Sequence, residues 1–346
     1  MDPLDGLTGM VGQEFVAFLE NHPWFELTFL GASDRSAGKK YSEATTWRLG
    51  GETPAYVRDI VVSDSKPDNA PQLMFSAMDA SVATEIEQAF AASGRTIVSN
   101  SRNHRMDIDV PLLVPEINAD HLGVLPIQRA MRGWKGQIVT NPNCSTIQMV
   151  VALKPIHQAA KIKRVVVSTY QSTSGAGKEA MDELLNQTKS FFVNQTLDSK
   201  KFTKNIAFNV IPHIDVFMED GSTKEEWKMV VETKKILDPK IKVHATCVRV
   251  PTFIGHAEAI NLELEEPLDD VEARRVLAAS PGVMVIDRRE NGGYITPQEV
   301  TGQDAVFVSR VRVDPTVDNG LSLWVVSDNL RKGAALNAIQ IAEELV

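Results

Sequence analysis

The stretch of sequence that most constrains the fold is Asn141-Pro-Asn-Cys-Ser-Thr-Ile-Gln148. The residue before a proline is pushed out of the α region, so a helix cannot run through Asn141. Beyond it, apolar residues recur with helical spacing, which predicts a helix that begins near Cys144. Unpaired N–H groups and the positive dipole at a helix N-terminus lower a thiol pKa from ~8.5 towards neutrality. Those N–H groups and the Asn143 amide can hold an oxyanion, so we interpret Cys144 as a nucleophile rather than a buried structural cysteine.

Length and charge limit the class of protein. A chain of 346 residues is long for one hydrophobic core and predicts two domains, while the net charge of -9 disfavours nonspecific binding of nucleic acid. Two cysteines, Cys144 and Cys247, are too few for a disulfide scaffold or a multi-cysteine zinc site, and we expect no metal. No apolar run approaches the ~20 residues of a membrane span. The N-terminus lacks the layout of a signal or transit peptide, so we expect a cytoplasmic protein without a membrane partner.

A glycine-spaced loop opens the chain, as Gly6-Leu-Thr-Gly-Met-Val-Gly12, and an amphipathic helix should follow it and end near Pro23. Such a loop is typical of a dinucleotide phosphate site, although a plain turn before a helix is about as frequent. A second strand is predicted at residues 25–30. After it, where a cofactor ribose should lie, Asp34 suits NAD, whereas Ser33, Arg35 and Ser36 favour NADP.

The next segments alternate between strands and a helix. We predict strands at residues 60–62, 73–76 and 96–99 and a helix at residues 80–92, which is the pattern of a parallel sheet with crossover helices. The basic turn at residues 101–105 either holds an anion or is a solvated loop.

The first strand of a dinucleotide fold is the feature that does not fit. Such a strand is buried, β-branched and directly before the glycine loop, but only Met1-Asp-Pro-Leu-Asp5 precedes the loop here. We therefore expect that this strand is missing or truncated. Either the chain starts late, through a truncated or mis-started gene, or the strand is absent and the nucleotide site is compromised.

The second half of the chain predicts a different kind of sheet. Its strand candidates have the spacing of a mixed or antiparallel sheet, and lie at residues 164–170, 243–250, 260–264, 306–311 and 322–327. Helices are predicted at residues 179–185, 224–237 and 334–345. Sheets of this kind often form dimer interfaces, so we expect an oligomer.

Taken together, these stretches resemble the aspartate-semialdehyde dehydrogenase family, in the family's order and over nearly the whole chain. The glycine loop is unspecific, but the cysteine, Trp-Lys, Arg-Val-Pro and Gly-His elements are specific. The matching stretches are Gly6-Leu-Thr-Gly-Met-Val-Gly12, Arg35-Ser-Ala-Gly-Lys-Lys40, Asn141-Pro-Asn-Cys-Ser-Thr146, Gln171, Glu225-Glu-Trp-Lys228, Arg249-Val-Pro251, Gly255-His256 and Asp328-Asn-Leu-Arg-Lys-Gly333.

The resemblance implies a fold and a reaction. A Rossmann-like NADP-binding domain would span residues 1–143 and be completed by the last helix, residues 328–346. An α+β catalytic and dimerisation domain would span residues 144–327, in a homodimer or homotetramer. The reaction would be reversible: L-aspartate 4-semialdehyde, phosphate and NADP⁺ give L-4-aspartyl phosphate, NADPH and a proton. Its reductive direction serves the biosynthesis of lysine through diaminopimelate, and of threonine and methionine.

The resemblance also assigns residues. It implies Cys144 as the acyl-forming nucleophile, His256 as the general acid/base and Gln171 as the residue that orients the substrate. Arg249 would bind the substrate α-carboxylate and Glu225 its amino group. The phosphate would be held by Arg102 and Lys228, with Asn143 nearby. The cofactor contacts would be Thr8, Gly9, Met10, Val11, Ser33, Arg35, Ser36, Ser174, Gly175 and Asn329.

The chemistry agrees with these residue types independently of the family. An acyl phosphate made from an aldehyde requires a covalent thioester, so that the oxidation conserves energy before phosphate attacks. Histidine, with an ordinary pKa of ~6.5, suits the proton exchange at the thiohemiacetal oxygen. A planar carboxylate calls for a bidentate arginine. Read singly, His256 could be a turn histidine, Arg249 and Lys228 surface charges, and Gln171 a cap of the following turn.

Two other enzyme families and one non-enzyme remain as alternatives. An N-acetyl-glutamyl-phosphate reductase is disfavoured by its different cysteine motif. A malonyl-CoA reductase also needs a carboxylate grip such as Arg249, but an amine-binding acid at Glu225 favours the aspartyl substrate. The third alternative, suggested by the missing first strand, is an inactive relative that only binds nucleotide or partners.

Overall fold

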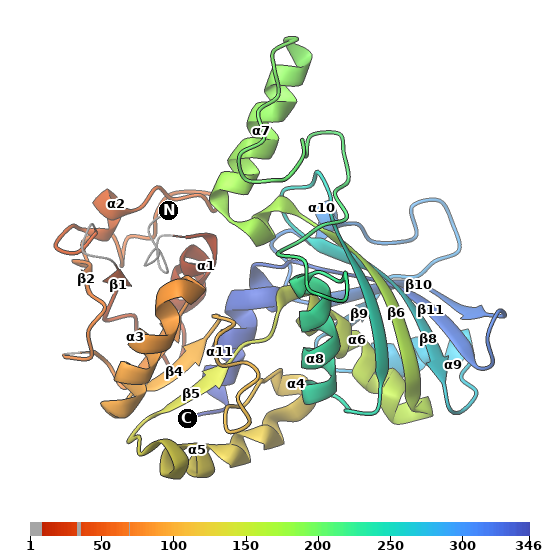
Figure 1. The fold of residues 1–346 in the computed structure, drawn as a ribbon, viewed down its shortest axis with the longest axis horizontal. Helices are drawn as coiled ribbons and strands as arrows, with labels where there is room; N and C mark the ends of the chain where they lie inside the picture. The colour runs from red at the N-terminus through yellow and green to blue at the C-terminus, as the bar shows by residue number, and fades with distance from the viewer. Residues whose placement is uncertain (1–8, 33–35, 69) are drawn as a thin grey trace. The chain divides into compact units, whose positions relative to one another are not determined.

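The computed structural model describes residues 9–32, 36–68 and 70–346. The chain forms two compact units (Figure 1). The first contains the described residues up to Pro142 together with Ala334–Val346, and the second contains Asn143–Gly333. The segment before the glycine loop, where we expect the first strand to be missing or truncated, lies outside the described residues, as do the cofactor residues Thr8, Ser33 and Arg35. The domain limits given above, residues 1–143 with 328–346 and residues 144–327, stay a prediction. None of the helices in the described ranges combines the length and apolar character of a membrane span.

The first unit contains a three-stranded parallel sheet in the order β3–β4–β5 (Figure 1). Two of its strands, β3 (Leu73–Ser76) and β4 (Thr96–Ser99), and the intervening helix α3 (Ala80–Ala92) have the predicted bounds, and β5 is Gln137–Thr140. The carboxylate of Asp79 caps α3 by accepting a hydrogen bond from the Ser81 backbone N–H. The remaining elements of this unit are α1 (Met10–Leu19), β1 (Gly31–Ala32), α2 (Tyr41–Ala44), β2 (Ser63–Asp64), α4 (Pro115–Asn118), a 3₁₀ turn η1 (Ala119–Val124), α5 (Leu125–Arg132) and α11 (Leu336–Glu343).

Two strand predictions in this unit were wrong. In place of strands at residues 25–30 and 60–62, the short strands β1 and β2 pair in parallel. Residues 25–30 alternate between covered and exposed side chains but form no ladder with a described strand. Hydrophobic alternation records which side chains are covered, whereas a strand also requires a neighbouring backbone to bond to. For residues 25–30, the hydrophobic pattern therefore predicted correctly which side chains are covered, but it predicted wrongly that the backbone pairs with a neighbouring strand.

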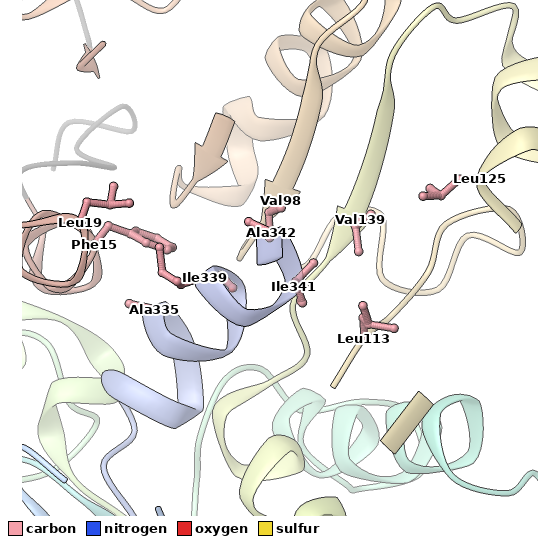
Figure 2. Packing of buried hydrophobic residues seen from close by; sticks show 11 residues of the cluster. Phe15, Leu19, Val98, Leu113, Leu125, Val139, Ala335, Ile339, Ile341 and Ala342 are labelled. Carbon is pink, nitrogen blue, oxygen red and sulfur yellow. The ribbon is translucent and has the colours of Figure 1, made fainter. Parts of the chain in front are cut away.

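The core of the first unit joins its earliest helix to its last one. Figure 2 shows Phe15 and Leu19 of α1 next to Ile339 of α11, and Val98 of β4 next to Ala342. All five side chains are buried. Burying an apolar side chain of the size of Phe or Ile contributes about 1.5–3 kcal/mol. The C-terminal helix is thus part of this core, although it follows the second unit in the chain.

The second unit is built on a six-stranded mixed sheet in the order β7–β6–β8–β11–β10–β9, which confirms the predicted kind of sheet (Figure 1). Its central pairs are antiparallel, while the edge strands β7 and β9 run parallel to their neighbours. The strands are β6 (Ile162–Gln171), β7 (Lys242–Arg249), β8 (His256–Leu264), β9 (Val283–Val285), β10 (Val306–Asp314) and β11 (Gly320–Ser327). β8 begins earlier than predicted, so His256 is a strand residue and not a turn residue.

Helices cover one face of this sheet. α6 (Cys144–Ala160), α8 (Lys224–Ile236) and α9 (Asp270–Ala278) contact its strands, and the buried alternate side chains of β8 belong to this face. On the opposite face the rings of Tyr170 and Trp324 lie 5.6 Å apart, and both are partly exposed. The unit's other elements are a 3₁₀ turn η2 (Thr173–Ala176), α7 (Lys178–Phe192), which is longer than predicted, and α10 (Pro297–Val300). A π turn, η3 (Arg331–Ala335), precedes α11.

Candidate active site

The candidate nucleophile is the first residue of α6, which confirms the predicted helix start at Cys144. Asn143 is the N-cap: its backbone is extended, and its Oδ1 accepts hydrogen bonds from the N–H groups of Ser145 at 3.0 Å and Thr146 at 3.3 Å. The Cys144 side chain is half-buried and forms no disulfide. A Cβ on Gly333 would lie 3.1 Å from the Cys144 Cβ, so a glycine at that position leaves room beside the thiol.

Asn143 is fixed by two carboxylates of α8. Its backbone N–H donates to Oε2 of Glu232 at 2.7 Å, and its side-chain Nδ2 donates to Oε1 of Glu225 at 2.9 Å. Glu232 was not predicted, although its helical spacing from Glu225 and Lys228 indicates that it shares their face. Residues 225, 228 and 232 lie on one face of a helix. These bonds hold the residue before the thiol in place.

A buried ion cluster lies next to this cap. The Lys228 ammonium donates to Oε2 of Glu225 and to Oδ2 of Asp215, both at 2.9 Å. Burial alone would raise the pKa of Glu225, but Lys228, the Asn143 amide and the Arg249 charge outweigh it and lower that pKa to about 2. Burial would likewise lower the pKa of Lys228, but the two carboxylates raise it. Both groups are therefore ionised at neutral pH, and Lys228 retains one N–H for a ligand.

The ends of two parallel strands bring the next two residues together. Gln171 ends β6, Arg249 ends β7, and the two are register partners. The Gln171 Nε2 donates to Oε1 of Glu225 at 3.2 Å, so it joins the cluster that holds the cap of α6. Arg249 is buried, and its Nη1 donates to the Ser172 carbonyl at 2.7 Å. Its other N–H groups bond to no residue in the described ranges, which leaves part of the guanidinium fork for a ligand.

His256 is fixed at the same edge of the sheet because β8 runs antiparallel to β6. Its Nδ1 lies 3.1 Å from both the backbone N and the Oγ of Ser172. A backbone N–H can only donate, so Nδ1 is the acceptor and the proton of the neutral ring is assigned to Nε2. Nε2 is buried and has no hydrogen-bond partner among the described residues. Burial, and then the Arg249 charge, lower the pKa of His256 to about 3.

This pKa differs from the ordinary value on which the sequence argument for proton exchange rests. The difference arises from burial and from a neighbouring cation, neither of which is visible in the local sequence. In the structure described here, His256 is a neutral ring with a proton on Nε2, ready to donate a hydrogen bond.

Gly175 leaves open space at that proton. A Cβ on Gly175 would lie 3.0 Å from Nε2 of His256 and 3.1 Å from Nη1 of Arg249, which is closer than side chains normally pack. The absence of a side chain at this position lets a ligand approach both groups.

Asn329 organises the same region. Its Oδ1 accepts hydrogen bonds from the Gly255 N–H at 2.9 Å, the Ser174 Oγ at 3.0 Å and the Ser172 Oγ at 3.1 Å. Ser172, which had not been predicted, therefore connects Asn329 to His256. The residues predicted to contact the cofactor in this unit, Ser174, Gly175 and Asn329, are brought together around His256.

A buried acid of β8, Glu258, was also not predicted. Glu258 is fully buried, and neither of its carboxyl oxygens makes a hydrogen bond within the described part of the chain. Burial raises the pKa of Glu258 well above its ordinary value, so this carboxyl is neutral. It adds no charge to the face of β8 that carries His256.

The remaining predicted residues belong to the first unit. Gly9 is the N-cap of α1, with no side-chain cap, and Met10 and Val11 begin that helix. Ser36 lies in the turn before α2, and Arg102 is an exposed residue of the loop after β4. The open first turn of α1 suits a phosphate group, because its backbone N–H groups are not used by a capping side chain.

Two family models match the chain. A semialdehyde dehydrogenase NAD-binding domain matches residues 5–124, and a semialdehyde dehydrogenase dimerisation domain matches residues 153–332. The sequence is 49% identical over 349 residues to the aspartate-semialdehyde dehydrogenase of Aquifex aeolicus, covering 99% of this chain and 96% of that protein. It is 41% identical over 343 residues to the enzyme of the same name from Rickettsia conorii, with the same coverage.

Solved structures give the same result. The crystal structure of aspartate semialdehyde dehydrogenase II from Vibrio cholerae matches this chain with a TM-score of 0.85 and 40% identity. The structure of that enzyme complexed with ASA matches with a TM-score of 0.86 and 39% identity. The enzyme from Candida albicans, solved with NADP, matches with a TM-score of 0.79 and 31% identity. Each alignment covers 98% of this chain and 96% of the other.

Proposed function

The chain belongs to the aspartate-semialdehyde dehydrogenase family, and from this premise we propose that it works through a thioester on Cys144. The reaction is the reversible, NADPH-dependent reduction of L-4-aspartyl phosphate to L-aspartate 4-semialdehyde and phosphate. One observation carries the proposal: Glu225 Oε1 accepts hydrogen bonds from both Asn143 and Gln171, so a single carboxylate connects the cap of the nucleophile's helix to the strand edge that bears Arg249.

In the oxidative direction, the Cys144 sulfur adds to the aldehyde carbon and forms a thiohemiacetal. The carbon then loses its hydrogen together with the two electrons of the C–H bond, as a hydride. The C–O double bond re-forms, and a thioester remains. A phosphate oxygen attacks the thioester carbon, the C–S bond breaks, and the thiolate leaves with the bonding pair. NADP, when bound, supplies the hydride acceptor in this direction and the donor in the other.

His256 acts on the oxygen of the thiohemiacetal. Its Nε2–H faces the space that Gly175 leaves open, where it donates a hydrogen bond to an oxyanion. A negative oxygen at that place raises the pKa of the ring, because an opposite charge stabilises the imidazolium. The Ser172 Oγ lies within hydrogen-bond distance of Nδ1, and it can accept a hydrogen bond from the Nδ1–H group once the ring is charged. In our proposal the ring becomes charged by taking up, on Nδ1, the proton released when the Cys144 thiol ionises. The charged ring then gives its Nε2 proton to the oxyanion and keeps the proton on Nδ1, and it regains the Nε2 proton when the oxygen is deprotonated before hydride leaves.

The ionic groups divide between substrate and phosphate. The open part of the Arg249 fork binds the α-carboxylate, and the ionised Glu225 binds the amino group. The third N–H of Lys228 and the second N–H of the Asn143 amide hold the phosphate, and the assignment of Arg102, in the first unit, to the same phosphate stays a prediction from the resemblance. Malonate semialdehyde has no amino group for Glu225, so this site favours the aspartyl substrate.

The cofactor of this NAD(P)-binding domain is NADP in our proposal. Support comes from Ser36, which lies in the described turn where a 2′-phosphate would bind, and from the Candida albicans relative solved with NADP. Within the part described, Gly9 at the start of α1 and Gly175 beside His256 fit a dinucleotide, because neither presents a side chain to it. The Ser33 and Arg35 assignments stay predictions.

We also propose a homodimer formed through the sheet of the second unit. The family model that matches this unit is a dimerisation domain, and the sheet face opposite α6 presents the Tyr170 and Trp324 ring pair. A second copy would cover these partly exposed rings.

The function is tested by the purified chain's reduction of NADP⁺. With L-aspartate 4-semialdehyde we expect continuous NADPH formation only when phosphate is present, because phosphate must discharge the thioester before the next turnover. Without phosphate we expect at most one equivalent per active site. Sustained reduction with malonate semialdehyde and coenzyme A, and none with the aspartyl substrate, would instead support the malonyl-CoA reductase reading.

A further inference from the structure

Asp215 is a charged residue of the ion cluster that has no part in the mechanism above. It lies in the loop before α8, and 17% of its side chain is exposed. Its Oδ2 accepts a hydrogen bond from the Lys228 ammonium at 2.9 Å, and its Oδ1 accepts one from the Val216 backbone N–H, also at 2.9 Å. Both oxygens are therefore held, and this carboxylate is not a mobile surface charge.

The backbone on either side of Asp215 is also held. Its φ is 68°, in the left-handed region, where Asp and Asn are the residues best tolerated after glycine. Before it, Ile211 exchanges two backbone hydrogen bonds with Arg249, at 2.8 and 2.9 Å. After it, the Lys224 N–H donates to the Val216 carbonyl at 2.8 Å. The loop thus connects the end of β7 to the start of α8 and fixes Asp215 between them.

Lys228 is shared between two carboxylates, which changes the charge that the cluster presents. Asp215 and Glu225 each accept a hydrogen bond from its ammonium at 2.9 Å, and all three side chains are largely covered. One ammonium cancels one carboxylate, so the three side chains together carry one net negative charge. Without Asp215, the charges of Lys228 and Glu225 would cancel. Salt screens such covered charges much less than exposed ones, so the difference acts on a ligand.

This net charge matches one group of the proposed substrate. L-Aspartate 4-semialdehyde carries an α-carboxylate, assigned to Arg249, and an α-ammonium, assigned to Glu225. The carboxylate balances the Arg249 charge, and the ammonium balances the negative charge of the cluster. An analogue that has the carboxylate but lacks the amino group leaves the cluster unbalanced in a site from which water is displaced, and an unpaired charge there is unfavourable.

We propose that Asp215 determines the selectivity of the site for substrates with an α-amino group. It cancels the Lys228 charge that would otherwise repel the substrate ammonium, and so leaves the full charge of Glu225 to attract it. The same carboxylate opposes the binding of phosphate at the third N–H of Lys228. Removing its charge therefore has opposite effects on the two ligands. This inference deepens the proposed function and rests on it.

The test compares kcat/KM for L-aspartate 4-semialdehyde with kcat/KM for succinate semialdehyde, which differs only in lacking the amino group. Asp215→Asn keeps an oxygen acceptor and tolerates the left-handed backbone, but removes the charge. We expect the ratio of the two values to fall roughly tenfold, as the loss of one unit charge in a partly covered site implies. The KM for phosphate should fall. If the analogue is not turned over, its inhibition constant against the semialdehyde supplies the comparison.

Two further variants separate charge from loop structure. Asp215→Gly keeps the backbone conformation and removes the whole side chain, so it should lower the ratio as Asp215→Asn does. Asp220→Asn removes a charge from an exposed position of the same loop and should leave the ratio unchanged. A loop that had merely lost its structure would raise the KM for both aldehydes alike.

Two failures are distinguishable. If the unaltered chain does not reduce NADP⁺ with the aspartyl substrate and phosphate, the proposed function is wrong, and this inference with it. If the unaltered chain is active but the ratio is the same in Asp215→Asn, or in Asp215→Gly should the first variant fail to fold, this inference alone is overturned. An equal fall of the ratio in Asp220→Asn, or a KM for phosphate that rises in Asp215→Asn, would also overturn it.

Discussion

Replacing Cys144 by alanine should abolish turnover. We expect the rate of NADP⁺ reduction to fall by at least about 10⁴-fold, because no other group can form the covalent thioester. The fold should persist: the cap of α6 is made by Asn143, and alanine is the best helix former. The measurement compares the steady-state rate with the thermal unfolding midpoint of the same preparation.

Cys247 provides the matched control. It is fully buried on β7, and burial raises the pKa of the Cys247 thiol, so it should not react as a thiolate. Cys247→Ala should therefore retain activity within a few-fold of the unaltered chain. A Cys144→Ala protein that keeps more than about one per cent of the activity would rule out the thioester mechanism.

Arg249→Lys has the second-largest expected effect, on substrate binding. Lysine presents one point charge where the guanidinium offers a planar fork, so the paired hydrogen bonds to the α-carboxylate are lost. Losing about 2–3 kcal/mol of charge-assisted bonding corresponds to a KM for the semialdehyde raised roughly 30- to 150-fold. The maximal rate should change much less, because the carboxylate does not react.

Arg275→Lys is the control for this substitution, because Arg275 is an exposed residue of α9 whose guanidinium pairs with Glu272. Its KM should equal that of the unaltered chain. An unchanged KM in Arg249→Lys, with or without a lower maximal rate, would remove Arg249 from the carboxylate site.

The sequence predicted the features that depend on local chemistry. Asn-Pro before a run of helical apolar spacing predicted the start of α6 at Cys144, and the structure has it there. Strand patterns in the second half predicted a mixed sheet, and the strand ends bring Gln171, Arg249 and His256 to one edge. These predictions succeeded because helix caps and the alternation of apolar and polar side chains in strands depend only on residues close in sequence.

What the sequence could not predict depends on contacts between distant residues. The bond from the Asn143 N–H to Glu232 and the bond from the Ser172 N–H to His256 each join segments more than eighty positions apart. The low pKa of His256 results from burial beside Arg249, which no local motif records. The prediction of a strand at residues 25–30 was wrong for the same reason. A strand ladder needs a neighbouring backbone as well as an apolar pattern.

The central claim is that the acyl group is carried by Cys144, and peptide mapping by mass spectrometry tests it most directly. The chain is incubated with L-aspartate 4-semialdehyde and NADP⁺ without phosphate, digested at low pH and mapped. We predict one aspartyl adduct per chain, on the peptide that contains Cys144, which disappears when phosphate is added and is absent from Cys144→Ala. NADPH formation without an adduct on Cys144, or an adduct on another residue that phosphate discharges, would contradict the account.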